Sequence, residues 1–254
     1  MTLQFPPYVH SVFTGPTSNW PVVGQIRNAC SFTSLANVLN TRAGDFIHTP
    51  AEFIREAGLL FQPNMGGTVP ALKVWQLRKR GFGSHFGNLR YTNCEYVLCQ
   101  LIDMGIPCII DIYTARQVGF TRVFGQHAVV LVGYSDLFMA KNGQAHREYY
   151  IIDSQWPALG DFKIDANNVD RDGDGIAEDY PGNRTLSRAE FLRIFSTRCY
   201  APIFPSQMAH DLWYGRTFRL QTPSKWESWV TGSNDRLANP YLHAHNVSKN
   251  HTND

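Results

Sequence analysis

A cysteine at the start of an amphipathic segment is the first residue of this chain whose position could support chemistry. The stretch GQIRNACSFTSLANVLN, residues 24–40, places Cys30 on the first turn of an expected helix, with Gln25 five residues before it. Free backbone N–H groups and the positive end of the helix dipole favour a thiolate at such a position. Cys30 is therefore a candidate nucleophile. The side-chain amide of Gln25 and the backbone N–H of Cys30 are candidate donors to a developing oxyanion.

A thiol nucleophile needs a base, and the base needs a group that orients it. His127 begins one strand-like segment, and Asp153 lies at the end of the next one. Two adjacent antiparallel strands can place these two side chains next to each other. Taken singly, Cys30 and His127 could be core residues and Asp153 a turn acid. Taken together, and in the order cysteine, histidine, acid, they predict a catalytic triad.

The elements that must position these residues follow from local signals. Thr49 and Thr68 are expected helix N-caps, and so is Ser187. Pro50 is expected at a first helical position, and Gly58 and Gly81 should end helices. The expected helices span about 29–42, 49–58, 68–81, 92–105 and 187–195. The expected strands, rich in β-branched and aromatic residues, span 107–115, 126–136, 147–155, 198–204 and 212–222.

Helices dominate the first half of this order and strands the second. The pattern predicts an α+β fold in which an N-terminal helical half packs on an antiparallel sheet half. We expect one domain over residues 1–204 and a C-terminal extension over residues 205–254. The end of that extension is polar and rich in Asn and His, and we expect it to be disordered.

Several stretches resemble papain-like cysteine peptidases, and within them the bacterial branch of bacteriocin-processing (double-glycine) peptidases. VVGQIRNACSFTSLANVL resembles the cysteine helix, GQHAVVLVGYSD the histidine strand, and EYYIIDSQWP the strand that carries the third residue. GGTVPALKVWQLRKRGF and TNCEYVLCQLIDMGIPCIIDI resemble the intervening helices and strand, and TLSRAEFLRIF the helix after the acid. The resemblance covers residues 20 to 204 and implies a papain-like fold and a hydrolase that acts on a protein or peptide substrate.

The chain departs from the pattern of that bacterial branch in two places. There the acid is usually followed by proline, whereas here Asp153 is followed by Ser154, Gln155 and Trp156. DSQW is similar to the Asn-Ser-Trp of papain, with Asp153 in place of the asparagine. The extension after Phe204 has no counterpart in the resemblance.

An acidic loop over residues 165–180 suggests a second site. Asp170, Asp172 and Asp174 alternate before Gly175, and Ile176 and Asp179 are further candidate ligands. Alternating carboxylates around a glycine turn can surround Ca²⁺, which takes six to eight oxygen ligands. The stretch resembles half of an EF-hand loop and the calcium repeats of thrombospondin. We expect a structural Ca²⁺ here, although the same residues would also suit a solvated acidic turn.

Composition bears on several other classes of function, although a net charge of +2 argues neither for nor against nucleic-acid binding. The net charge of +2 and the absence of a basic block give no sign of nucleic-acid binding. No run of about 18 apolar residues is present, so we expect no membrane span. The five cysteines are odd in number and match no zinc spacing. We expect no organic cofactor. No signal peptide is visible, while a calcium loop would favour an exported protein.

Two other functions fit the same residues. An acyltransferase or deamidase could use the same thioester chemistry on the same fold. A catalytically idle, calcium-dependent binding module would keep the fold without a reactive Cys30. The sequence determines neither the cleavage specificity nor the oligomeric state.

Overall fold

The computed structural model of the chain describes residues 8–15, 17–25, 28–62, 67–68, 70–89, 93–118, 121–139, 145–155, 157–158, 161–162, 167–170 and 175–218. The helices within these residues are α1 (Cys30–Ala43), α2 (Pro50–Ala57), α3 (Pro70–Lys79), α4 (Cys94–Asp103), α5 (Arg188–Ile194) and α6 (Gln207–Phe218). Three short 3₁₀ turns are η1 (Thr17–Asn19), η2 (Gly58–Leu60) and η5 (Phe195–Thr197).

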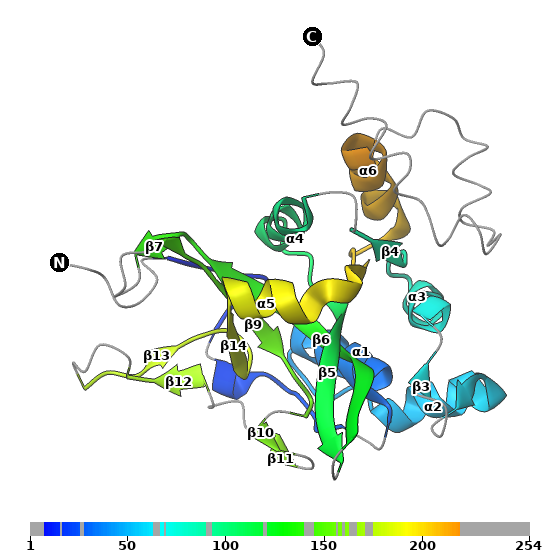
Figure 1. Ribbon diagram of the computed structural model, residues 1–254. Coiled ribbons are helices and arrows are strands. Elements are labelled where there is room, and N and C mark those ends of the chain that lie inside the picture. Colours follow the sequence, from blue (N-terminus) through cyan, green and yellow to red (C-terminus); the bar gives the residue numbers. More distant parts are fainter. Residues whose placement is uncertain are drawn as a thin grey trace.

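A seven-stranded antiparallel sheet forms the centre of the molecule (Figure 1). Its members are β1 (Val9–Ser11), β4 (Gly87–Asn88), β5 (Cys108–Val118), β6 (Thr121–Ser135), β9 (Glu148–Ile152), β14 (Arg184–Ser187) and β15 (Cys199–Pro202). The order across the sheet is β14-β9-β6-β5-β15-β4, and β1 pairs with the end of β6. The predicted α+β class is confirmed, with helices concentrated in the first half of the chain.

Four further pairs of two-residue strands lie outside this sheet. They are β2 (Phe61–Gln62) with β3 (Gly67–Thr68), β7 (Phe138–Met139) with β8 (Ala145–His146), β10 (Pro157–Ala158) with β11 (Asp161–Phe162), and β12 (Asn168–Val169) with β13 (Glu178–Asp179). The pair β12–β13 belongs to the acidic loop that the sequence singles out.

Helices cover both faces of the sheet because its strands are apolar on both sides. Alternate residues of β5 and β6, such as Ile109 and Val130, join a core with residues of α1, α2 and α3. Their neighbours, such as Ile110 and Val129, join a second core with residues of α4, α5 and α6. Strands buried on both faces read as continuous hydrophobic runs, as AVVLV in β6 does, whereas the run in β5 is interrupted by Asp111.

Local capping signals account for several helix boundaries. The Thr49 side chain accepts the N–H of Glu52, with Pro50 as the first residue of α2. Ser187 accepts the N–H of Glu190 at the start of α5. These two predicted caps are confirmed, and each satisfies a backbone donor that the helix leaves unpaired.

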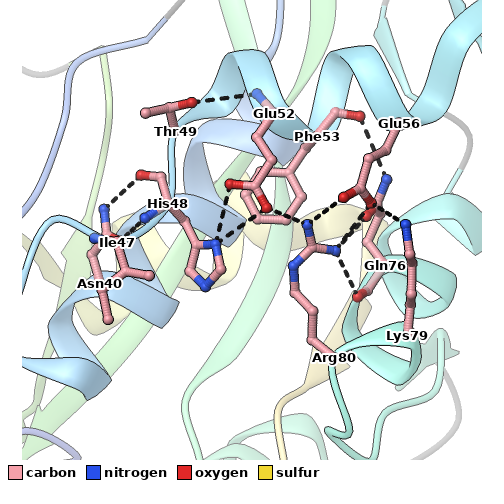
Figure 2. A network of polar contacts seen from close by, with 10 residues as sticks. All are labelled: Asn40, Ile47, His48, Thr49, Glu52, Phe53, Glu56, Gln76, Lys79 and Arg80. Carbon is pink, nitrogen blue, oxygen red and sulfur yellow. Dashed lines mark hydrogen bonds and ion pairs between the residues drawn. The ribbon is translucent and has the colours of Figure 1, made fainter.

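A polar network joins the first three helices (Figure 2). The buried Asn40 of α1 donates to the carbonyl of His48 and accepts the N–H groups of Ile47 and His48, so it holds the chain entering α2. Arg80, just after α3, pairs with Glu52 at 2.5 Å and with Glu56 at 2.9 Å, both on α2. The network fixes α2 and α3 against α1, which is the helix that begins at Cys30.

Two predicted elements are wrong. The segment 212–222 was expected to be a strand, but residues up to Phe218 belong to α6. The side chains of Trp213 and Tyr214 join the core at helical spacing from the buried His210, and this packing outweighs their strand propensity. Thr68 lies in β3 rather than at a helix N-cap, because α3 begins only at Pro70.

A buried chain of hydrogen bonds attaches α6 to the domain. His85 Nδ1 lies 2.8 Å from His210 Nε2, and His85 Nε2 lies 2.9 Å from the hydroxyl of Tyr200. His210 Nδ1 lies 2.8 Å from a carboxylate oxygen of Asp211. These contacts are satisfied when both imidazoles are neutral and each donates one N–H. Burial and the nearby Arg78 guanidinium lower the pKa of both histidines.

We therefore expect the protein to lose stability as the pH falls below about 6.5, the ordinary pKa of histidine. The unfolded chain then binds protons that His85 and His210 do not bind in the folded state, so the stability present at higher pH is lost progressively. Urea unfolding between pH 5 and pH 8 measures the slope. His210→Gln should flatten it, whereas His146→Gln, a change on β8, should not. Equal slopes in the wild type and His210→Gln would contradict the expectation.

Candidate active site

Cys30 is the first residue of α1 and is partly exposed, whereas the ten residues that follow it are buried. The N-cap residue of α1 is Ala29, which makes no side-chain capping hydrogen bond. The next turn is docked on the sheet, because the hydroxyl of Ser34 donates to the carbonyl of Ala128 on β6 at 3.0 Å. Cys30 therefore sits at a helix N-terminus held against the strand that carries His127.

His127 and Asp153 come together through strand register. Val130 on β6 pairs with Ile152 on β9, so Asp153, the next residue, lies diagonally across from His127. Diagonal neighbours on antiparallel strands are within reach of long side chains. His127 Nε2 lies 2.8 Å from Asp153 Oδ1, and both side chains are only 4% exposed. The second ring nitrogen, Nδ1, is the atom left to face the thiol.

The thiol and the imidazole change each other's protonation. Burial alone would raise the pKa of Cys30, but a hydrogen bond and the positive charge of His127, with the backbone N–H of Ala128, lower it below the ordinary value. Burial alone would lower the pKa of His127, but its contacts with Asp153 and Cys30 raise it to about 9. The arrangement therefore favours a thiolate beside an imidazolium, the form in which a cysteine is nucleophilic.

The other four cysteines have the opposite environment. Burial raises the pKa of Cys94, of Cys199 and of Cys108, and it raises the pKa of Cys99 to about 11. All five cysteines are free thiols. Cys30 is thus the one thiol of the chain whose surroundings lower its pKa.

Three groups that the sequence analysis missed hold the acid. The carboxylate of Asp153 accepts the N–H of Gln155 on Oδ1 at 2.9 Å and Nη1 of Arg184 on Oδ2 at 3.0 Å. The buried side chain of Asn183 contacts the backbone N–H and carbonyl of Asp153 at 2.8 and 2.9 Å. Burial would raise the pKa of Asp153, but His127, Gln155 and Arg184 lower it. The acid is therefore held ionised.

Gln25 lies close to the residue that follows the acid. Its backbone N–H donates to the carbonyl of Ser154 at 3.2 Å, and the Ser154 hydroxyl donates to its Oε1 at 3.1 Å. The segment before Gln25 is held from α1, since the side chain of Asn37 bonds both the N–H and the carbonyl of Val23. Because Oε1 accepts from Ser154, the amide nitrogen is the donor end of the Gln25 side chain.

A buried ion pair lies close enough to influence Cys30. Lys73 Nζ on α3 lies 2.7 Å from Asp111 Oδ1 on β5, and the lysine side chain is 2% exposed. Asp111 pairs in register with Ala128, whose backbone contacts the thiol. The ammonium of Lys73 makes a further small contribution to lowering the pKa of Cys30. Nothing in the local sequence of α3 marks this lysine, which lies among apolar residues.

The predicted calcium ligands lie only partly within the described residues. Asp172 and Asp174 lie outside them. Asp170 accepts the N–H of Gly175 at 2.9 Å, and Asp179 accepts the N–H of Thr17 at 2.7 Å. Ile176 is exposed. Among the described residues no group of three or more His, Cys, Asp or Glu side chains could hold a metal, so the calcium site stays a prediction.

Comparison with known protein families finds a match for this chain. The model of the Peptidase_C39 like family matches residues 2–165, more than half of the chain. The chain belongs to the Peptidase_C39 like family. This membership agrees with the resemblance to the bacteriocin-processing branch of papain-like cysteine peptidases and makes the chain a member of a cysteine-peptidase type of family. No curated protein matches the chain.

The family match includes Cys30, His127 and Asp153 but ends before Asn183 and Arg184. The two residues that hold the backbone and carboxylate of Asp153 thus come from beyond the matched segment. In the part of the chain that the structure describes, no helix is long and apolar enough to cross a membrane.

Cys30 should be the most reactive thiol of the protein. At pH 6 we expect iodoacetamide to alkylate it roughly tenfold or more faster than any of the other four cysteines, because only its pKa is lowered. His127→Ala should remove this advantage, and His146→Ala should leave it. Mass spectrometry of tryptic peptides after timed labelling measures each rate. Similar rates at Cys30 and Cys99 would contradict the environment described above.

Proposed function

We propose that the protein is a cysteine peptidase that cleaves peptide or related amide bonds through a thioester at Cys30. The observation that carries this proposal is the buried hydrogen bond between His127 and Asp153, on a histidine that also contacts the thiol of Cys30. A buried imidazole paired with a carboxylate on one side and a thiol on the other is the arrangement that activates a cysteine nucleophile.

The first half of the reaction forms the acyl-enzyme. The thiolate of Cys30 attacks the carbonyl carbon, and the carbonyl oxygen becomes an oxyanion. The backbone N–H of Cys30 and the amide of Gln25 are the proposed donors to this oxyanion. The imidazolium of His127 gives its Nδ1 proton to the leaving nitrogen, the C–N bond breaks, and a thioester and a free amine result.

The second half regenerates the thiolate. His127, now neutral, takes a proton from water, and the hydroxide attacks the thioester carbonyl. The C–S bond breaks, the product leaves as a carboxylic acid, and Cys30 and His127 return to the ion pair. Asp153 orients His127 and stabilises its charged form through both steps, without itself becoming protonated.

The proposed active form, a Cys30 thiolate beside a protonated His127, exists only between the pKa values of these two groups. The ion pair forms as the pH rises through the lowered pKa of Cys30 and is lost as it rises through the pKa of His127, about 9. We therefore expect a bell-shaped dependence of kcat/KM on pH with its basic limb near pH 9. Cys30→Ala should abolish turnover, while His146→Ala should not change it. A proteome-derived peptide library, analysed by mass spectrometry for new termini, supplies substrates and the activity measurement.

The same library separates the competing functions. New peptide termini that depend on Cys30 support the peptidase. Ammonia release, or transfer to an added amine, without chain cleavage would show a deamidase or an acyltransferase instead. A Cys30 with ordinary reactivity and no turnover of any kind would leave a binding module and overturn the proposal.

We also propose that residues 165–180 bind Ca²⁺ in a structural role, supported by the alternation of Asp170, Asp172 and Asp174 around Gly175. A cation bound only to the folded state adds about 2.7 kcal/mol of stability at a hundredfold excess over its Kd. A calcium-dependent loop would suit an exported protein, because calcium is abundant outside the cell.

Calcium should raise the melting temperature, and Asp172→Ala should abolish the rise. Asp136→Ala, a change to an acid outside the loop, is the control and should keep it. Turnover far below the melting temperature should persist in EGTA. No shift in melting temperature at millimolar calcium would leave the loop as a solvated turn, whereas lost turnover in an intact fold would make the metal part of the active site.

A further inference from the structure

The segment Gly182–Asn183–Arg184 lies directly against the acid of the proposed triad. Gly182 has a φ of +75°, and a Cβ there would lie 2.2 Å from the carbonyl oxygen of Ile151, so no other residue fits. This close approach carries Asn183, 1% exposed, onto the backbone of Asp153. The asparagine amide pairs with the N–H and carbonyl of Asp153 as a neighbouring strand would. The backbone of the acid is thereby fixed one residue past the end of β9.

Arg184 divides its guanidinium between two carboxylates. Nη1 lies 3.0 Å from Asp153 Oδ2, and Nη2 lies 3.0 Å from Glu190 Oε1 on α5. The arginine side chain is 18% exposed, so the contact with Asp153 is largely shielded from water. Because Asp153 Oδ1 already contacts His127, an arginine on Oδ2 fixes the plane of the carboxylate. A carboxylate held at both oxygens presents a single direction to the imidazole.

The buried charges of Cys30, His127 and Asp153 balance only when Arg184 is counted with them. In the proposed active form Cys30 and Asp153 are negative and His127 is positive, which leaves one uncompensated negative charge at a buried site. Arg184 neutralises it, and the more exposed Glu190 faces the arginine from its other side. An uncompensated buried charge is costly and is normally removed by protonation. Without the arginine, Asp153 or the thiolate would be the group to take up that proton.

We propose that Arg184 is a positioning residue for the Cys30–His127 pair, because it fixes the orientation of the Asp153 carboxylate and balances the buried charge of the thiolate form. This inference rests on the proposed function. The arginine acts through Asp153 and does not itself touch the thiol. It lies beyond residue 165, so the family match does not supply it.

The pH dependence follows from the groups that face Asp153. These are His127 from β6 and Arg184 from β14, with Cys30 acting through the imidazole and Glu190 through the guanidinium. Lys73 of α3 also acts on Cys30, already paired with Asp111, and is unchanged in the variants. Removing the positive charge of Arg184 makes each proton in the cluster harder to lose. Both the acid limb, where the thiolate forms, and the basic limb, where the imidazolium loses its proton, should therefore move to higher pH.

The test is the pH dependence of Cys30 alkylation by iodoacetamide, which needs no substrate, together with kcat/KM on a cleaved peptide. Arg184→Met should move the acid limb to higher pH by a measurable fraction of a pH unit, less than the roughly 1 unit or more expected of an opposite charge in direct contact, because the arginine acts through Asp153. It should also lower kcat/KM by roughly 10- to 100-fold through misplacement of the imidazole. Arg184→Lys keeps the charge, so it should keep the limbs in place and lose only part of the rate.

Two controls separate positioning from folding. Arg188→Met changes an arginine at the start of α5 that pairs with Glu95 and not with Asp153, so it should leave the limbs and kcat/KM unchanged. In an Asp153→Asn background, Arg184→Met should add little, because the charge on which it acts is gone. Rates are normalised to the fraction of Cys30 that reacts in the fast phase at pH 6, because only the folded site gives this enhanced rate.

Unmoved limbs and an unchanged normalised rate in Arg184→Met would overturn the inference while leaving the proposed function intact. If Arg184→Met does not fold, Arg184→Lys and Glu190→Gln are measured in its place. Normalised rates equal to those of the wild type in both variants would also overturn the inference about Arg184. A wild-type Cys30 with ordinary reactivity would overturn the proposed function itself, and this inference with it. The result that supports the inference is a shift of the pH limbs to higher pH in Arg184→Met and no such shift in Arg188→Met.

Discussion

His127 and Asp153 share a 2.8 Å hydrogen bond at a place where each side chain is only 4% exposed. Charged groups at so dry a position need partners, because burial without them disfavours ionisation. The site meets that requirement with a row of groups of alternating charge. In space the thiol is followed by the imidazole, the carboxylate of Asp153, the guanidinium of Arg184 and the carboxylate of Glu190. Each charge is stabilised by the one beside it, so the reactivity of the first group depends on groups that never approach it.

The alternation requires five separate parts of the fold to meet. The start of α1 brings the thiol, β6 the imidazole, the end of β9 the acid, the start of β14 the arginine, and α5 the glutamate. The antiparallel ladder β6–β9–β14 fixes three of these by register, because Arg184 pairs with Ile151 and Ile152 pairs with Val130. The sheet therefore does more than support a helix with a cysteine. It sets the order of the charges.

The difference between contacts within a few residues and contacts between distant parts of the chain explains what could be predicted from the sequence. The first residues of α2 and α5 were predictable, because Thr49, Pro50 and Ser187 begin these helices through contacts only a few residues away in the sequence. Cys30 and Asp153 carried local signs as well, a helix start and a strand end, whereas His127, expected at a strand start, lies inside β6. Arg184 carried none, since its partner lies 31 residues earlier in the chain. Lys73 was hidden for the same reason, among the apolar residues of α3.

The strand expected over 212–222 is wrong for a different reason, because here a local propensity was present but misleading. Its aromatic residues have high strand propensity, yet Trp213 and Tyr214 pack beside the buried His210 on one face of a helix. Packing against the core decided the outcome, because the rings of Trp213 and Tyr214 both contact His85, which no local window around α6 contains. The acidic loop illustrates a third case, because two of its three alternating aspartates lie outside the described residues.

The fixation of Asn183 has a consequence for how this protein can be produced. Asn183, Arg184 and Thr185 form an N-x-T triplet, the acceptor sequence for N-linked glycans. In the folded chain this asparagine is 1% exposed, with both ends of its amide on the backbone of Asp153. A eukaryotic secretory host that modifies nascent chains would place a sugar where no room exists, and the acid would lose its support. Replacing the asparagine to prevent glycosylation would remove the same two hydrogen bonds, so Thr185 is the position at which the acceptor sequence can be broken while the amide stays in place.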